Sequence, residues 1–120
     1  MRAPPRKPWT QEEFFAWAQQ QDSRYEFDGF EPVVMIGGTQ SHGRISRNLL
    51  VQLTAKLAVS PCEATGSDGA GVATIDKRIR YPEAVVTCNP SEINPNLIHE
   101  PIVVFEVLSE SSRYATRTRS

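Results

Sequence analysis

The chain has few cysteines and no long apolar run, and these shortages exclude several classes of protein. No stretch approaches the roughly 20 apolar residues of a membrane-spanning helix, and no apolar segment follows the basic N-terminal residues as in a secretory signal. The two cysteines, Cys62 and Cys88, are too few for a disulfide framework and form no CxxC pair. We therefore expect a soluble protein of the reducing cytoplasm.

An excess of either charge is also missing, since 13 basic and 14 acidic side chains leave a net charge of −1. A dedicated duplex-binding domain usually carries a basic excess, so neutrality argues against tight nonspecific binding of nucleic acid but allows a local patch. The length of 120 residues favours one domain. We expect a loose leader at 1–8, the domain at 9–113 and a polar tail at 114–120.

Two segments have the patterns of helices. Thr10 and Glu13 stand at capping-box spacing before a short amphipathic stretch that reaches about residue 21. Apolar residues recur every four positions over 41–58, which predicts a longer helix packed on a sheet.

The remaining patterns are those of strands and turns. A β-hairpin is predicted where 25–27 and 32–36 flank the turn residues Asp28 and Gly29. A surface loop is predicted at 88–101, which is rich in proline and asparagine. Further strands are predicted at 62–64, 72–75, 79–87 and 101–108. Together with the helices, these strands predict an α+β or α/β domain with a mixed sheet.

One carboxylate, Glu106, lies within the nearly continuous apolar segment 101–108, which is typical of a strand covered on both faces. Alternation along the strand puts Glu106 on the same side as Val104, so partial burial is expected. A buried carboxylate needs a metal ion, a cation or a hydrogen-bond network. A structural role also remains open, in which Glu106 pairs with Arg80 or Arg113.

A second acid, Glu83, enters the apolar segment 84–87 directly after Pro82 and could lie beside Glu106. Two acids at the ends of neighbouring strands supply the hard oxygen ligands that a divalent metal ion needs, open toward a phosphate. Such an ion polarises a phosphoryl oxygen and lowers the pKa of its bound water. Neither acid indicates this chemistry alone.

The segments 24–53, 80–88 and 101–112 resemble, in order and spacing, the signature blocks of the Uma-two family of predicted restriction-endonuclease-like proteins. The resemblance implies a PD-(D/E)XK nuclease fold, with a mixed central sheet flanked by helices, that cleaves DNA. It also implies Mg²⁺ or Mn²⁺ as cofactor and Glu83 and Glu106 as the catalytic metal ligands, at the family's Pro-Asp and Glu-Val-Leu-Ser positions.

Three other polar residues fall within matching blocks and are candidates for accessory roles. Glu26 is a possible further metal or water ligand, or an ordinary hairpin acid. His42 stands at a helix N-terminus that favours an anion such as phosphate, although a capping or structural role is the simpler interpretation. Asp68 lies between glycines, where a turn aspartate is the simpler interpretation.

The chain departs from the family pattern in two ways. Glu83 replaces the usual aspartate, and no lysine follows Lys77, although the resemblance implies a later helix that carries one. We therefore expect a C-terminally truncated form, with a frameshift or a premature stop as the hypothesis for its origin and a natural short form as the open alternative. Loss of the later elements would expose the apolar faces of the Glu106 strand and of the long helix, which favours a homodimer.

The leading hypothesis is a metal-dependent endonuclease, with an inactive form left open. The alternative is a non-catalytic remnant that dimerises or associates with DNA. A small-ligand-binding α+β protein is a third class, without a specific feature in its favour.

Overall fold

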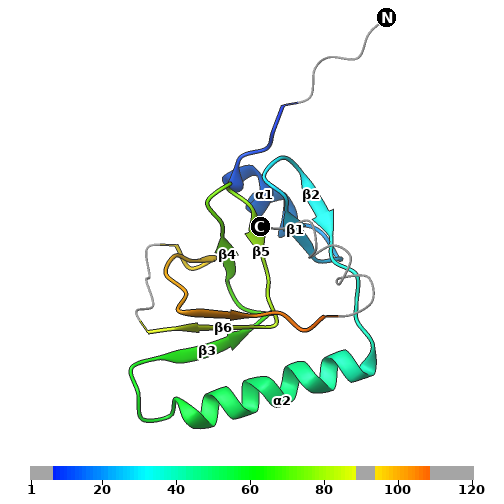
Figure 1. Ribbon diagram of the computed structural model, residues 1–120. Coiled ribbons are helices and arrows are strands. Elements are labelled where there is room, and N and C mark those ends of the chain that lie inside the picture. Colours follow the sequence, from blue (N-terminus) through cyan, green and yellow to red (C-terminus); the bar gives the residue numbers. More distant parts are fainter. Residues whose placement is uncertain (1–6, 89–93, 109–120) are drawn as a thin grey trace, which may run out of the picture.

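The computed structural model describes residues 7–88 and 94–108, which form two helices and two β-sheets (Figure 1). The larger sheet has the strand order β2-β1-β5-β4-β7, and the smaller has the order β3-β6-β8. The predicted α+β class is confirmed, and the sheet is divided in two. The elements are α1 (Gln11–Ala18), β1 (Tyr25–Phe27), β2 (Pro32–Val34), α2 (Gln40–Lys56), β3 (Glu63–Gly66), β4 (Gly71–Ala73), β5 (Ile79–Arg80), β6 (Ala84–Thr87), β7 (Leu97–Ile98) and β8 (Val103–Phe105).

Helix α1 begins at the predicted capping box. The Thr10 hydroxyl accepts a hydrogen bond from the Glu13 amide at 3.0 Å, and the Thr10 amide donates to Glu13 Oε1 at 2.8 Å. These bonds satisfy two backbone donors at the helix start. The helix then turns Phe14 into the core, where its ring stacks on Phe27 with centroids 5.4 Å apart. The buried residues of this core are Phe14, Phe27, Ile79 and Leu97.

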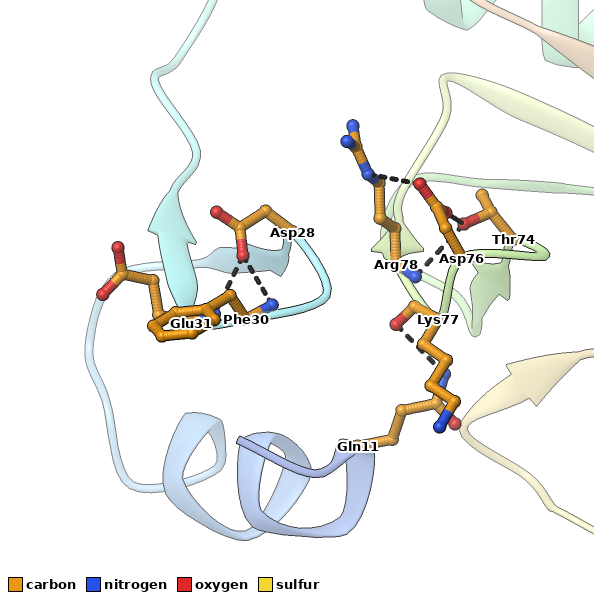
Figure 2. Close-up of polar contacts among 8 residues, drawn as sticks. All are labelled: Gln11, Asp28, Phe30, Glu31, Thr74, Asp76, Lys77 and Arg78. Atoms are coloured by element: carbon orange, nitrogen blue, oxygen red, sulfur yellow. Dashed lines mark hydrogen bonds and ion pairs between the residues drawn. The ribbon is translucent and has the colours of Figure 1, made fainter. Parts of the chain in front are cut away.

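Strands β1 and β2 form the predicted hairpin, with Tyr25 paired to Val34. Asp28 Oδ1 accepts hydrogen bonds from two backbone amides of the turn, each at 2.8 Å (Figure 2). Gly29 has a φ of +92°, a conformation that costs glycine little because it lacks a Cβ. Local side-chain chemistry therefore fixes this turn.

The prediction of a single strand over 79–87 was wrong, because Pro82 divides the segment into two strands. β5 belongs to the larger sheet and β6 to the smaller one. Proline has no amide hydrogen to donate to a ladder, and 81–83 cross from one sheet to the other. This crossing places Glu83 at the junction of the two sheets.

The surface loop predicted at 88–101 also needs correction, since it contains β7. This short strand pairs in parallel with β4, with Leu97 opposite Gly71. Leu97 is buried in the core, which explains why a turn-rich segment forms a strand. Residues 89–93 of the loop lie outside the described residues.

Helix α2 and the smaller sheet form the second layer, and Figure 1 shows α2 running beside β3, at the opposite end of the molecule from α1. The helix matches its predicted bounds closely. The strand predicted at 101–108 is shorter, since β8 covers three residues, and it is not covered on both faces by the described residues. Val103 and Val104 are 41% and 43% exposed.

The two cysteines are bonded to each other, which the expectation of a reducing cytoplasm did not foresee. Glu63 and Thr87 are partners in the β3–β6 ladder, and Cys62 and Cys88, one step further along, are joined by a disulfide. The cytoplasmic location therefore stays a prediction. No helix of the described segments has the length and apolar character needed to cross a membrane.

Candidate active site

Glu83 and Glu106 lie next to each other at the end of the β6–β8 ladder. Ala84 pairs with Phe105 in antiparallel register, so the two glutamates occupy the next step beyond this pair. Proximity is also visible in their electrostatics, because the Glu83 carboxylate contributes to a raised pKa of Glu106. The structure thus brings together the two acids that the sequence nominated.

Glu83 connects α2 with the end of β8. Its Oε1 lies 3.0 Å from Nε2 of His42, and its Oε2 accepts a hydrogen bond from the Val107 amide at 2.9 Å. The same Nε2 lies 3.0 Å from the Val107 carbonyl oxygen. Because both neighbours of Nε2 are acceptors, this nitrogen carries the hydrogen. Both side chains are about one-fifth exposed, at 20% for His42 and 18% for Glu83.

Two residues before α2 fix the position of His42. The Thr39 hydroxyl caps the helix by accepting from the His42 amide at 3.1 Å. A Cβ at Gly38 would lie 2.9 Å from Nδ1 of His42, closer than side chains normally approach. Glycine at this position therefore leaves the space that the imidazole occupies beside Glu83.

Glu106 has a cationic neighbour in Arg80, whose Nη2 lies 3.7 Å from Glu106 Oε1. Burial raises the pKa of Glu106 most strongly, because desolvation penalises the carboxylate, while Arg80 lowers it. Glu83 and Glu26 raise the pKa further and His42 lowers it. The pairing with Arg80 that the sequence left open is present, while Arg113 lies outside the described residues.

Glu26 approaches the same group of side chains from β1. Its Oε2 accepts a hydrogen bond from the Tyr81 amide at 2.9 Å, which ties β1 to the segment that crosses between the sheets. Burial raises the pKa of Tyr81, Arg24 lowers it and Glu26 raises it. Glu26 also adds negative charge near Glu106 and so contributes to the raised pKa of that carboxyl group.

Asp68 has a different set of neighbours. It forms an ion pair with Arg24 at 3.3 Å, its side chain is fully exposed, and Arg24 also donates to the Ser67 carbonyl. The Arg24 guanidinium lies over the Tyr81 ring, 5.2 Å from its centroid. Asp68 and Arg24 line a cavity of about 480 Å³ that α1 borders. The structure therefore groups Glu26, His42, Glu83 and Glu106 and leaves Asp68 with Arg24.

The donor set suits a hard cation only in part. Among the described residues, no group of three or more histidines, cysteines and carboxylates is arranged to hold a metal ion. Two adjacent carboxylates remain, and Mg²⁺ is commonly held by one or two carboxylates together with waters and substrate phosphates. Glu83 keeps lone pairs beyond its two hydrogen bonds, since an ionised carboxylate offers about four acceptor sites.

Sequence patterns alone missed the role of Gly38 and gave Arg80 only as one possible partner of Glu106. The sequence did contain a signal for the position of Arg80. Ile79 and Tyr81 on either side of it pack in or against the core, so by strand alternation Arg80 must face away from α1. The approach of His42 to Gly38 depends on the path of the chain into α2, and no local pattern marks it.

The chain is similar to a known protein family and to a curated protein. The sequence profile of the Uma2 family, described as "Putative restriction endonuclease", matches residues 11–119. The "Uncharacterized protein slr1290" of Synechocystis sp. is 29% identical over 102 residues, which cover 84% of this chain and 54% of that protein. The chain thus spans about half the length of this relative. No solved structure matches the chain. Since the profile match extends over most of the sequence, the chain belongs to the Uma2 family.

Proposed function

We propose that this chain carries the acid pair of a metal-dependent endonuclease that hydrolyses DNA phosphodiester bonds. The adjacency of Glu83 and Glu106 at one end of the β6–β8 ladder is the observation that supports this proposal most directly. Membership of a family described as restriction endonucleases supports a nuclease in general terms. The metal, the substrate and the two site residues are parts of the proposal.

Glu83 and Glu106 would hold Mg²⁺ or Mn²⁺ through hard carboxylate oxygens. When bound, such an ion supplies electrophilic activation of a phosphoryl oxygen and of a water molecule. A rigid sheet fixes the backbone of both acids, and positional tolerance in such sites is about 0.5 Å. The ladder pairing of Ala84 with Phe105 therefore sets the spacing on which the proposal depends.

The neighbouring side chains position the two acids and balance their charge. His42 donates from Nε2 to Glu83 and keeps the carboxylate beside β8. Arg80 offsets the negative charge that accumulates around Glu106. With Glu26 nearby, the group carries three carboxylates against one arginine, so a divalent cation would complete its charge balance.

A plasmid-nicking assay with Mg²⁺ or Mn²⁺ tests this function. Cleavage should be lost in Glu83→Ala and in Glu106→Ala and kept in Glu63→Ala, which alters an exposed acid of β3. Calorimetric titration with Mn²⁺ should show weak binding that either of the first two variants abolishes. Cleavage that survives both substitutions would exclude the assigned acid pair.

A second function, a non-catalytic module that dimerises or associates with DNA, is supported by the exposed side of β8. Ile102, Val103 and Val104 are 63%, 41% and 43% exposed, and β8 is an outer strand of the smaller sheet in the described part of the chain. An open apolar edge favours pairing with another strand. Light scattering would show a dimer, and Val104→Lys should convert it to a monomer.

A further inference from the structure

The structure assigns a phosphate-binding subsite to Arg78 and Arg80, which we propose bind the DNA backbone beside the acid pair. This inference rests on the proposed nuclease function and names the group that would anchor its substrate. The two arginines border a small cavity of about 100 Å³. The residues that line it are Glu26, Phe27, Asp28, Val33, Arg78 and Arg80.

Strand alternation places the two arginines on one face of the larger sheet. Ile79 lies between them and is fully buried in the core beneath α1, so Arg78 and Arg80 project from the opposite face. Phe27 pairs with Ile79, so Glu26, which precedes Phe27 on β1, joins the same polar face. The cavity and the acid pair share this face through Arg80, which reaches Glu106.

Arg80 has unused capacity for hydrogen bonding. Its side chain is 19% exposed, and its Nε is buried without a hydrogen-bond partner among the described residues. The contact of Nη2 with Glu106 is 3.7 Å long, which exceeds hydrogen-bonding distance. Because Nε is closed to solvent, an oxyanion in the cavity would bind through the terminal nitrogens of the guanidinium, whose acidic neighbour Glu106 lies beyond hydrogen-bonding distance.

An ion pair with Asp76 holds the Arg78 side chain in place. Its Nε lies 2.8 Å from Asp76 Oδ2, and Figure 2 shows the terminal guanidinium nitrogens extending away from Asp76. Gly29 of the β1–β2 turn packs against the Arg78 stem, where an added Cβ would lie 3.8 Å from Cγ. The ion pair with Asp76 thus orients the guanidinium and leaves its terminal nitrogens free of this contact.

The acids that border the cavity already have partners. Glu26 Oε2 accepts from the Tyr81 amide, and Asp28 Oδ1 accepts from two amides of the turn. Neither forms a short ion pair with Arg80. A phosphate has tetrahedral oxygens that match the forked donors of arginine, which makes it a better ligand here than a simple halide.

Titrations without metal test the subsite. The whole chain, kept in EDTA, is titrated with inorganic phosphate and separately with a short duplex oligonucleotide. Arg80→Gln should weaken both by about tenfold, the loss expected for one charged donor group, and Arg78→Gln should weaken them less because Asp76 already engages it. Arg47→Gln, which removes an exposed arginine of α2, is the matched control and should leave both affinities unchanged.

A second measurement does not depend on the variants folding. In the unaltered chain, phosphate should shift the amide resonances of 26–28 and 78–80 more than those of α2. Unshifted resonances at saturating phosphate, or an Arg80→Gln variant with unchanged affinity, would overturn the subsite. Phosphate binding without oligonucleotide binding would also overturn it as a DNA subsite.

The two proposals fail in distinguishable ways. If DNA binding requires Arg80 but no metal-dependent cleavage is seen, the proposed nuclease function is excluded and the phosphate subsite is supported. Cleavage that needs Glu83 and Glu106 but continues unchanged in Arg80→Gln would keep the nuclease and reject the subsite.

Discussion

Glu83 and Glu106 stand side by side one step beyond the last pair of the β6–β8 ladder, although 22 intervening residues separate them in the sequence. The side chain of Glu83 reaches the backbone of Val107 and so joins the ends of the two strands. Because His42 holds the same carboxylate from α2, changes at any of these positions should affect both the stability of the fold and the geometry of the candidate site.

The His42–Glu83 contact should contribute measurably to folding. His42→Ala leaves a carboxylate with 18% side-chain exposure short of one donor, and we expect a loss of about 1–2 kcal/mol in the free energy of unfolding. Urea denaturation measures this loss. His99→Ala, at an exposed histidine, should change stability by less than about 0.5 kcal/mol. Equal effects of both substitutions would contradict the assigned contact.

Gly38 should act through His42. Gly38→Ala places a Cβ 2.9 Å from the imidazole, so the ring must move away from Glu83 and the protein should be destabilised. In a double-mutant cycle, Gly38→Ala should cost clearly less in the His42→Ala background, since the clash is then gone. Gly37→Ala is the control, because a Cβ there meets no atom within 4 Å. Additive effects of the two changes would show that Gly38 acts independently of His42.

Glu106 should make the stability of the metal-free protein depend on pH. The raised pKa of Glu106, caused mainly by burial, means that the folded state holds this proton more tightly than the unfolded state. The stabilisation that this bound proton gives the folded state is therefore complete below the ordinary pKa of a glutamate. It is lost as the pH rises through the raised pKa of Glu106. Compared with Glu106→Gln, the parent protein should lose stability over this interval. Parallel pH profiles in thermal melts would argue against the shift.

Phe14 should be essential to the core beneath α1. Its side chain is fully buried and stacks on Phe27, so Phe14→Ala should cost about 3–5 kcal/mol, a large share of the stability of a small domain. Circular dichroism during urea unfolding measures the change. Val59→Ala, at a fully exposed position, should be within about 0.5 kcal/mol of the parent.

The Cys62–Cys88 bond should stabilise the smaller sheet. It joins positions 26 apart in the sequence, and closing a loop of that length is worth about 3.5 kcal/mol in the unfolded-chain model. Reduction and Cys88→Ser should lower the melting temperature by similar amounts, and reduction should not affect the Cys88→Ser variant further. Two titratable thiols in the purified, unreduced protein would show that the bond does not form.

Sequence alone determined the elements that short-range chemistry specifies. The capping box at Thr10 and Glu13 and the turn at Asp28 and Gly29 involve residues at most three positions apart, so their hydrogen bonds could be inferred from spacing. The periodic apolar residues of α2 are equally local. The nomination of Glu83 and Glu106 came from their apolar surroundings and from family resemblance, and their roles stay predictions.

Tertiary structure decided everything that depends on register between distant segments. Whether Glu83 meets Glu106, whether Cys62 meets Cys88 and whether 97–98 join a sheet are set by strand pairings across the chain. A shift of one residue in any ladder would turn each side chain to the opposite face, and a local pattern does not encode that choice. The division at Pro82 and the position of His42 beside Glu83 follow from the same long-range packing.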